Sequence, residues 1–266
     1  FLEHSVVGGS SRRRCERTRD RWRIIYGLGC MQGGIGTLPE SRISQERRLR
    51  TAPDKEALTM EGIMLRLAAG VIRFQNDVYP KKKVLFEELS KGQAPEALFI
   101  ACSDSRVEIA MITQTEPGDL FVVRNAGNIV PPHTDHTGGV IASIEFAVAA
   151  LEVPHVVICG HTDCGAMRGA MDPEAVDALP RVKEWLGFSK AAVETTNVLG
   201  KGLAEDERLL MLLEQNVVLQ LRHLKTHPTV ARRLAAGDLQ LHGWLYDIKT
   251  GDVHAYDETQ GKFVTV

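Results

Sequence analysis

Residues 97–106, Ala-Leu-Phe-Ile-Ala-Cys-Ser-Asp-Ser-Arg, and residues 155–165, His-Val-Val-Ile-Cys-Gly-His-Thr-Asp-Cys-Gly, decide the fold of this chain. In each stretch, an apolar run typical of a buried β-strand ends on residues that can bind a metal. The carboxyl ends of parallel strands meet at one edge of a sheet, where ligands usually bind. Cys102, His161 and Cys164 are therefore predicted to converge there, although they are far apart in the sequence.

Two thiolates and one imidazole form a donor set that suits zinc in tetrahedral geometry. Three protein ligands leave the fourth position free for a water molecule, which distinguishes a catalytic zinc site from a structural one. The sequence therefore predicts one catalytic Zn²⁺ per chain, held by Cys102, His161 and Cys164.

The rest of the pattern alternates strands with helices, which predicts an α/β fold with a mostly parallel β-sheet flanked by helices. Before the first strand, Ile63, Leu67, Val71 and Phe74 repeat at helical spacing, and this helix is predicted to end near Pro80. Further strands are predicted at residues 121–123, 240–248 and 253–256, and helices at residues 140–151, 163–171, 180–193, 205–224 and 228–236.

Composition narrows the classes of function. The 266 residues are 44% hydrophobic and carry a formal net charge of −2, so the overall charge does not favour nucleic acid or a membrane surface as partner. No run approaches the ~18 consecutive apolar residues of a transmembrane helix. Five cysteines form an odd set without a disulfide-like rhythm, which favours a reducing, cytoplasmic location and metal binding.

Residues 1–59 differ from the rest because they carry 12 Lys and Arg against 7 Asp and Glu. They show no sustained helical or strand period, so we expect a disordered extension or translated upstream sequence rather than part of the fold. A targeting segment, which would place the protein in an organelle, and a basic binding arm remain open alternatives. Residues 60–266 are predicted to form the catalytic domain.

Four segments together resemble the β-class carbonic anhydrases, most closely their plant-type and cyanobacterial branch, and the similarity covers most of residues 60–266. The resemblance implies zinc-dependent, reversible hydration of carbon dioxide to bicarbonate and a proton through zinc-bound hydroxide. It also implies a homodimer or higher homo-oligomer in which the N-terminal helices pack on a partner subunit. The segments are Cys-Ser-Asp-Ser-Arg (102–106), Gly-Asp-Leu-Phe-Val-Val-Arg-Asn-Ala-Gly-Asn (118–128), His-Thr-Asp-Cys-Gly (161–165) and His-Gly-Trp-Leu-Tyr (242–246).

Asp104 and Arg106 are the predicted catalytic pair. The guanidinium keeps the carboxylate ionised and orients it as an acceptor for the proton of the nucleophile. The resemblance implies that Asp104 can also become an alternative fourth zinc ligand in a closed state at lower pH. An ordinary loop ion pair is the simpler alternative.

Three more residues are predicted to bind substrate. By resemblance, Gln93 hydrogen-bonds carbon dioxide or bicarbonate in the neighbouring subunit. Gly165 begins a predicted helix, where its N–H could face an oxyanion. Phe121 supplies an apolar wall, although core packing explains this residue equally well.

Two other functions remain compatible with these residues. The same zinc site could hydrolyse COS or CS₂, which share the linear shape of carbon dioxide. Alternatively, the metal could stabilise a scaffold or carbon-sensing protein without turnover. His133 and His136, in a polar loop, are candidates for a proton relay, although histidines of such loops are more often merely solvated.

Overall fold

The computed structural model describes residues 60–135 and 137–266. The predictions for residues 1–59 and for His136 therefore lie outside the described residues. The chain divides into two units, residues 1–87 and residues 88–266, which are described separately. Among the described residues, no helix is both long enough and apolar enough to cross a membrane.

The described part of the first unit is helical. Helix α3 (Met60–Arg73) continues as a π-helical turn, η2 (Phe74–Val78), and a 3₁₀ turn, η3 (Tyr79–Lys82), before α4 (Lys83–Leu89). The helical run of α3 and η2 ends at Val78, close to the predicted end near Pro80, although its α-helical part ends earlier, at Arg73. Pro80 lies in the first turn of η3, where its missing N–H costs no hydrogen bond. The predicted apolar stripe is solvent-exposed in this single chain, with Ile63, Leu67 and Val71 each more than a third accessible.

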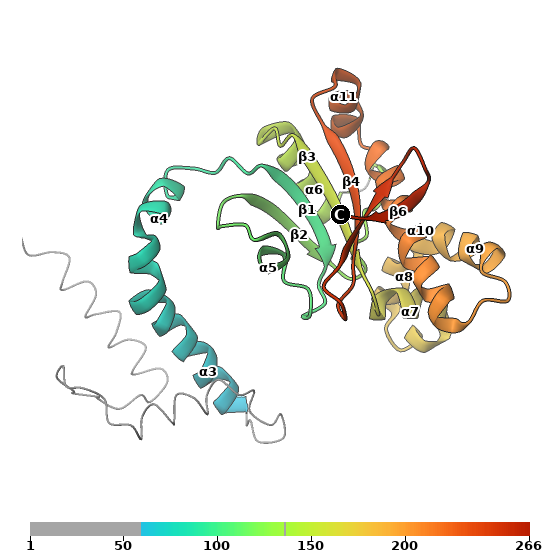
Figure 1. The fold of residues 1–266 in the computed structure, drawn as a ribbon, viewed down its shortest axis with the longest axis horizontal. Helices are drawn as coiled ribbons and strands as arrows, with labels where there is room; N and C mark the ends of the chain where they lie inside the picture. Colours follow the sequence, from blue (N-terminus) through green and yellow to red (C-terminus); the bar gives the residue numbers. More distant parts are fainter. Residues whose placement is uncertain (1–59, 136) are drawn as a thin grey trace, which may run out of the picture. The chain divides into compact units, whose positions relative to one another are not determined.

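The second unit is built on a six-stranded sheet of order β2-β1-β3-β4-β5-β6 (Figure 1). Strands β2, β1, β3 and β4 are parallel, as the alternating pattern predicted. Strand β5 runs antiparallel to β4, and β6 runs antiparallel to β5. The strands predicted at residues 240–248 and 253–256 are present and form an antiparallel hairpin, whereas β6 was not predicted from the sequence. The strands are β1 (Ala97–Cys102), β2 (Leu120–Asn125), β3 (His155–His161), β4 (Gln240–Tyr246), β5 (Val253–Asp257) and β6 (Lys262–Thr265).

The predicted helices are present, with two interruptions. The helix predicted at 180–193 is divided by the 3₁₀ turn η6 (Gly187–Ser189), and α6 ends in the π-helical turn η4 (Phe146–Ala150). Glycine has a low helix propensity, which accounts for a break at Gly187. The α-helices are α5 (Ile109–Thr113), α6 (Gly139–Glu145), α7 (Gly165–Met171), α8 (Pro180–Leu186), α9 (Lys190–Leu199), α10 (Glu205–Lys225) and α11 (Pro228–Ala236).

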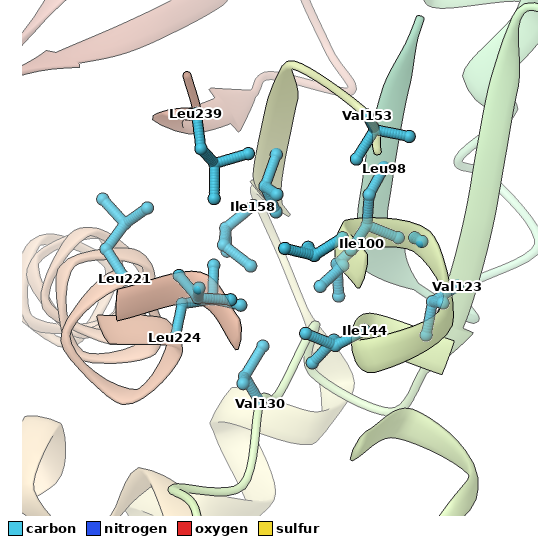
Figure 2. Packing of buried hydrophobic residues seen from close by; sticks show 14 of the residues in the cluster. Leu98, Ile100, Val123, Val130, Ile144, Val153, Ile158, Leu221, Leu224 and Leu239 are labelled. Carbon is cyan, nitrogen blue, oxygen red and sulfur yellow. The ribbon is translucent and has the colours of Figure 1, made fainter. Parts of the chain in front are cut away.

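The main core fills the space between the sheet and helices α6, α10 and α11. Figure 2 shows Leu98, Ile100 and Ile158 of the sheet facing Leu221 and Leu224 of α10, and all five side chains are buried. Strands β1 and β3 are buried along nearly their whole length, which explains why they read as continuous apolar runs. This packing fixes the two strands whose carboxyl ends carry the metal-type residues.

Candidate metal centre

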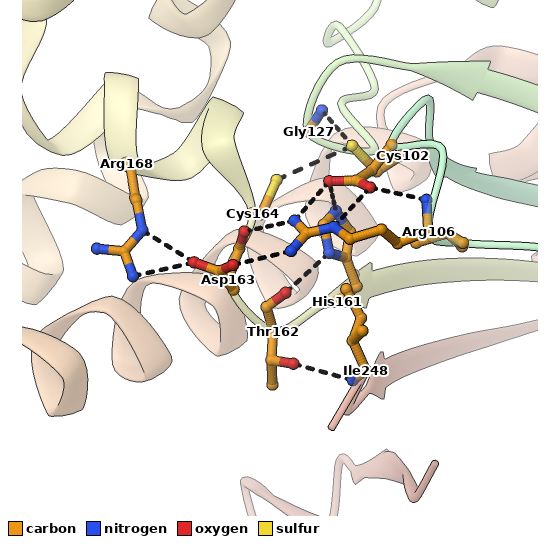
Figure 3. A network of polar contacts seen from close by, with 12 residues as sticks. Cys102, Arg106, Gly127, His161, Thr162, Asp163, Cys164, Arg168 and Ile248 are labelled. Carbon is orange, nitrogen blue, oxygen red and sulfur yellow. Dashed lines mark hydrogen bonds and ion pairs between the residues drawn. The ribbon is translucent and has the colours of Figure 1, made fainter. Parts of the chain in front are cut away.

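The carboxyl ends of β1 and β3 bring the predicted metal ligands together. Cys102 is the last residue of β1, His161 is the last of β3, and Cys164 immediately precedes α7. One ligand atom from each of the three buried residues lies within 4.8 Å of the others (Figure 3). The convergence predicted from the sequence is confirmed.

The side chains of Cys102 and Cys164 contact each other through their sulfur atoms. Their sulfur atoms are 3.9 Å apart, and the Gly127 N–H donates to the Cys102 sulfur at 3.4 Å. The hydrogen bond with Cys164 lowers the pKa of Cys102 to about 4, while the same contact and burial raise the pKa of Cys164 above its ordinary value. The contact between the two sulfur atoms therefore favours the thiolate form at Cys102, which is the form that binds a metal.

The His161 ring is oriented toward these sulfur atoms by its own backbone neighbour. Its Nδ1 atom lies 2.9 Å from the Thr162 carbonyl oxygen, which fixes Nδ1–H as the donor and leaves Nε2 with a free lone pair. Nε2 is buried and has no hydrogen-bond partner among the described residues. A buried, unpartnered nitrogen beside two thiols fits a metal ion and is costly without one.

Asp104 and Arg106 form the pair predicted from their spacing. The Arg106 Nε donates to Asp104 Oδ1 at 3.0 Å and one terminal nitrogen donates to Oδ2 at 2.8 Å, giving a bidentate contact. These hydrogen bonds hold the pKa of Asp104 well below its usual range. Asp104 Oδ2 lies 3.9 Å from His161 Nε2, so the ionised carboxylate borders the metal centre without belonging to its ligand cluster in this structure.

Asp163 extends this network, and the sequence analysis did not identify it. It accepts hydrogen bonds from Arg106 at 2.8 Å and from Arg168 at 3.0 Å, and both arginines lower its pKa. Asp163 has a φ of 57°, a left-handed conformation that aspartate tolerates better than most residues. The only feature of the sequence that could have indicated this role is the position of Asp163 between His161 and Cys164.

Arg124 was quoted within a motif, but its structural role appears only in the fold. Its guanidinium donates to the carbonyl oxygens of Cys102, Asp104 and Val107. Arg124 lies on β2 and therefore holds the loop after β1 in place from the neighbouring strand.

Buried polar residues of α10 support the loop after β2, and they too were missed. The Asn216 side-chain amide donates to the Gly127 carbonyl at 3.1 Å, and Ser189 and Gln220 donate to the Asn216 oxygen. Gln220 in turn accepts from the Val130 N–H. Since the Gly127 N–H donates to the Cys102 sulfur, α10 is connected to the metal centre through one residue, Gly127.

The three predicted substrate-binding residues occupy different places. Gly165 is exposed beside Cys164, and a Cβ atom added there would meet nothing within 4 Å. Phe121 lies near the start of β2, packs against the main core and contacts Phe146, with ring centres 6.0 Å apart. Gln93 is exposed in the loop before β1, at the end of that strand opposite Cys102. The structure thus brings only Gly165 close to the metal centre of its own chain.

Three histidines near the loop after β2 contact backbone carbonyls or each other. His223 Nδ1 lies 2.8 Å from the Val130 oxygen, and His227 Nε2 lies 3.0 Å from the Pro131 oxygen. The ring of His133 packs on that of His227, with centres 5.8 Å apart. His223 and His227 therefore contribute to holding the loop that follows β2.

Comparisons with known proteins agree with this site. The sequence model of the family described as carbonic anhydrase matches residues 97–253. A carbonic anhydrase of Pseudomonas aeruginosa is 50% identical over 197 residues, covering 74% of this chain and 89% of the relative. A carbonic anhydrase of Synechocystis sp. is 43% identical over 202 residues, covering 76% of this chain and 74% of the relative.

Solved structures assign the class. The β-carbonic anhydrase CcaA superposes with a TM-score of 0.75 at 42% identity, covering 76% of this chain and 99% of that chain. One of two tetrameric β-carbonic anhydrases from Sordaria macrospora superposes with a TM-score of 0.60 at 34% identity, covering 72% and 92%. By sequence, fold and the buried Cys-His-Cys cluster, this chain belongs to the β-class carbonic anhydrases.

Proposed function

We propose that this carbonic anhydrase reversibly hydrates carbon dioxide to bicarbonate and a proton, using one zinc ion held by Cys102, His161 and Cys164. The buried Nε2 of His161, which has no partner among the described residues and faces two thiols, is the observation that carries the proposal. When bound, zinc acts as a Lewis acid that makes water a nucleophile near neutral pH.

Asp104 directs the nucleophile in this proposal. Its Oδ2 atom lies at the border of the metal centre and is held ionised by Arg106, so it is an acceptor for the proton of the attacking oxygen. Accepting that proton directs an oxygen lone pair toward the carbon of the substrate. Arg106 serves as the positioning residue, because both Asp104 oxygens accept hydrogen bonds from it. Asp104 becomes the alternative fourth ligand of a closed state only if it leaves Arg106.

The remaining predicted residues complete the site in an oligomer. The open space above Gly165 leaves room for a small substrate beside Cys164. Gln93 and Phe121 lie away from the metal centre of their own chain, so we propose that they act on the site of a neighbouring subunit. The exposed apolar stripe of α3 supports a homodimer or higher homo-oligomer in which this helix packs on the partner.

The bounds of the catalytic domain and the cellular compartment are also part of the proposal. Residues 60–266 form the proposed catalytic domain, since the family match and the metal centre both fall within them. Cys102, Cys159 and Cys164 are free thiols, which supports a reducing compartment such as the cytoplasm. The proposed partners are small molecules, carbon dioxide and bicarbonate, rather than nucleic acid or a membrane.

Stopped-flow hydration of carbon dioxide by the purified chain, with zinc quantified in the same sample, tests the proposal. Fast turnover proportional to zinc content is expected. One zinc per chain without hydration above the buffer rate would refute the proposed function, and assays with COS and CS₂ would then decide between another hydrolase and a scaffold.

A further inference from the structure

Two histidines contact each other at the end of the sheet opposite the metal centre. His155 is the first residue of β3, whereas His161 is the last, and six residues of a strand span roughly 20 Å. His242 lies on β4, next to β3 in the sheet. Neither histidine contributes to the centre formed by Cys102, His161 and Cys164.

The strand register places both rings on one face of the sheet. His155 pairs with Gln240, and Val157 pairs with His242 in the parallel ladder between β3 and β4. Side chains two residues apart on a strand point to the same face, so His155, Val157 and His242 share it. The ladder between β3 and β4 includes both residues, and β1 pairs with His155 on the other side of β3, so the backbone of the pair is held before any ligand binds.

The distances within the pair match those of two histidines on one metal ion. His242 Nε2 lies 3.2 Å from His155 Nδ1, and the ring centres are 5.2 Å apart. A tetrahedral metal at about 2.05 Å from each nitrogen would separate the nitrogens by about 3.3 Å and the ring centres by about 5.2 Å. Two rings hydrogen-bonded head-on at the observed nitrogen distance would have centres about 5.5 Å apart. The observed centres are closer, so the two rings are inclined toward a common point.

The surroundings suit a metal that keeps part of its hydration. Both histidines are only partly buried, so water can occupy the remaining coordination positions. Neutral imidazole is a common ligand for nickel, copper and zinc. Burial lowers the pKa of His242, and the neighbouring His155 lowers it further. Both effects favour the neutral form that metal binding requires.

We propose that His155 and His242 form a second metal site, accessible to solvent, for a divalent transition-metal ion such as Ni²⁺, Cu²⁺ or Zn²⁺. The site is separate from the catalytic centre and does not depend on the function proposed above. An ordinary hydrogen bond between the two rings is the alternative to be tested.

Titration of the zinc-loaded full chain with Ni²⁺ tests this site, because nickel does not oxidise the free thiols. Binding is followed by calorimetry, and retained nickel and zinc are counted by mass spectrometry. The parent is compared with His155→Gln and His242→Gln. His254→Gln is the matched control, since His254 is a partly buried histidine on β5 that pairs with Leu245 and has no imidazole partner among the described residues.

The parent is expected to bind one Ni²⁺ beyond its zinc, and each glutamine variant of the pair is expected to weaken that binding at least about tenfold. His254→Gln should bind nickel like the parent. All variants should keep the parent's rate of hydration, which shows that they are folded. No nickel binding by the parent, or equal binding by His155→Gln and His242→Gln, would overturn the proposal.

Discussion

Arg106 donates a hydrogen bond to Asp163 at 2.8 Å, and this contact joins the two loops that supply the metal ligands. The same guanidinium holds Asp104, and it reaches Asp163 from a position 57 residues earlier in the sequence. Arg106 is 44% exposed and Asp163 is 56% exposed, which limits the energy of each ion pair. The value of the contact lies in fixing the direction of the Asp104 carboxylate rather than in stability.

Replacing Asp163 by asparagine should reduce hydration without releasing zinc. Asparagine tolerates the left-handed backbone at this position and keeps one carbonyl acceptor, but it removes the charge that holds Arg106. A surface ion pair contributes up to about 1 kcal/mol, so we expect the rate to fall by up to about fivefold. Asp177→Asn, which removes an exposed ion pair with Lys183 of α8, is the matched control and should change neither the rate nor the zinc content.

Asp104→Asn is expected to lose hydration while keeping its zinc. The amide cannot act as the ionised acceptor and offers Arg106 only one oxygen. Removing a group that orients the nucleophile typically costs about 100-fold or more in rate. Zinc content and stopped-flow rate are measured on the same sample. A variant as fast as the parent would support the ordinary ion pair considered from the sequence.

The rate of hydration should increase toward alkaline pH, and the protonation of Asp104 should not cause this increase. Its pKa in the folded chain is lowered, so its stabilising ion pair is present above about pH 4 and is lost only as the pH falls through that lower value. The carboxylate is therefore ionised throughout the mildly acidic and neutral range, and the acid limb of the rate profile reports the nucleophile. A profile that is flat from mildly acidic to alkaline pH would contradict this.

Zinc binding is expected to release about one proton per site near neutral pH. In the metal-free chain, the pKa of Cys102 is lowered to about 4 by the hydrogen bond with Cys164, whose own pKa is raised. The proton on Cys164 must therefore leave when the metal binds, and affinity should weaken as the pH falls. Calorimetry in two buffers of different ionisation enthalpy measures the release; identical heats in both buffers would contradict it.

Asn216→Ala should destabilise both the fold and the metal centre. The change removes the hydrogen bonds that Asn216 makes with the Ser189 hydroxyl, the Gln220 side-chain N–H and the Gly127 carbonyl, at a cost of about 1–3 kcal/mol in unfolding free energy. Zinc should also dissociate faster, because Gly127 donates to the Cys102 sulfur.

Thr196→Val provides the control for this experiment. The Thr196 hydroxyl is also buried but has no hydrogen-bond partner among the described residues. An isosteric apolar replacement there should be neutral or stabilising. Denaturant unfolding and zinc release to a chelator compare the two variants; equal zinc release by Asn216→Ala and the parent would show that α10 does not act on the metal centre.

Most of the sheet was predictable because its signals are local. Strands β1 and β3 are short apolar runs bounded by polar loops, and the alternation with helices predicted parallel pairing. The strand β6 was missed because its four residues, which include Lys262 at the edge, carry too short a pattern. The end of α3 at Arg73 was not predicted because residues 74–78 continue the helix as a π-helical turn, which apolar spacing does not distinguish from an α-helix.

By itself, the sequence determined the metal-binding chemistry and the parallel sheet, because the types of the ligands and the pattern of each strand depend on residues that are close together along the chain. Only the tertiary structure decided that Asp163 shares Arg106 with Asp104, that Asn216 reaches the Cys102 sulfur through Gly127, and that His155 meets His242. Each of these contacts joins residues at least 57 positions apart in the sequence. Strand register and helix packing bring such residues together, and neither can be read from the local sequence.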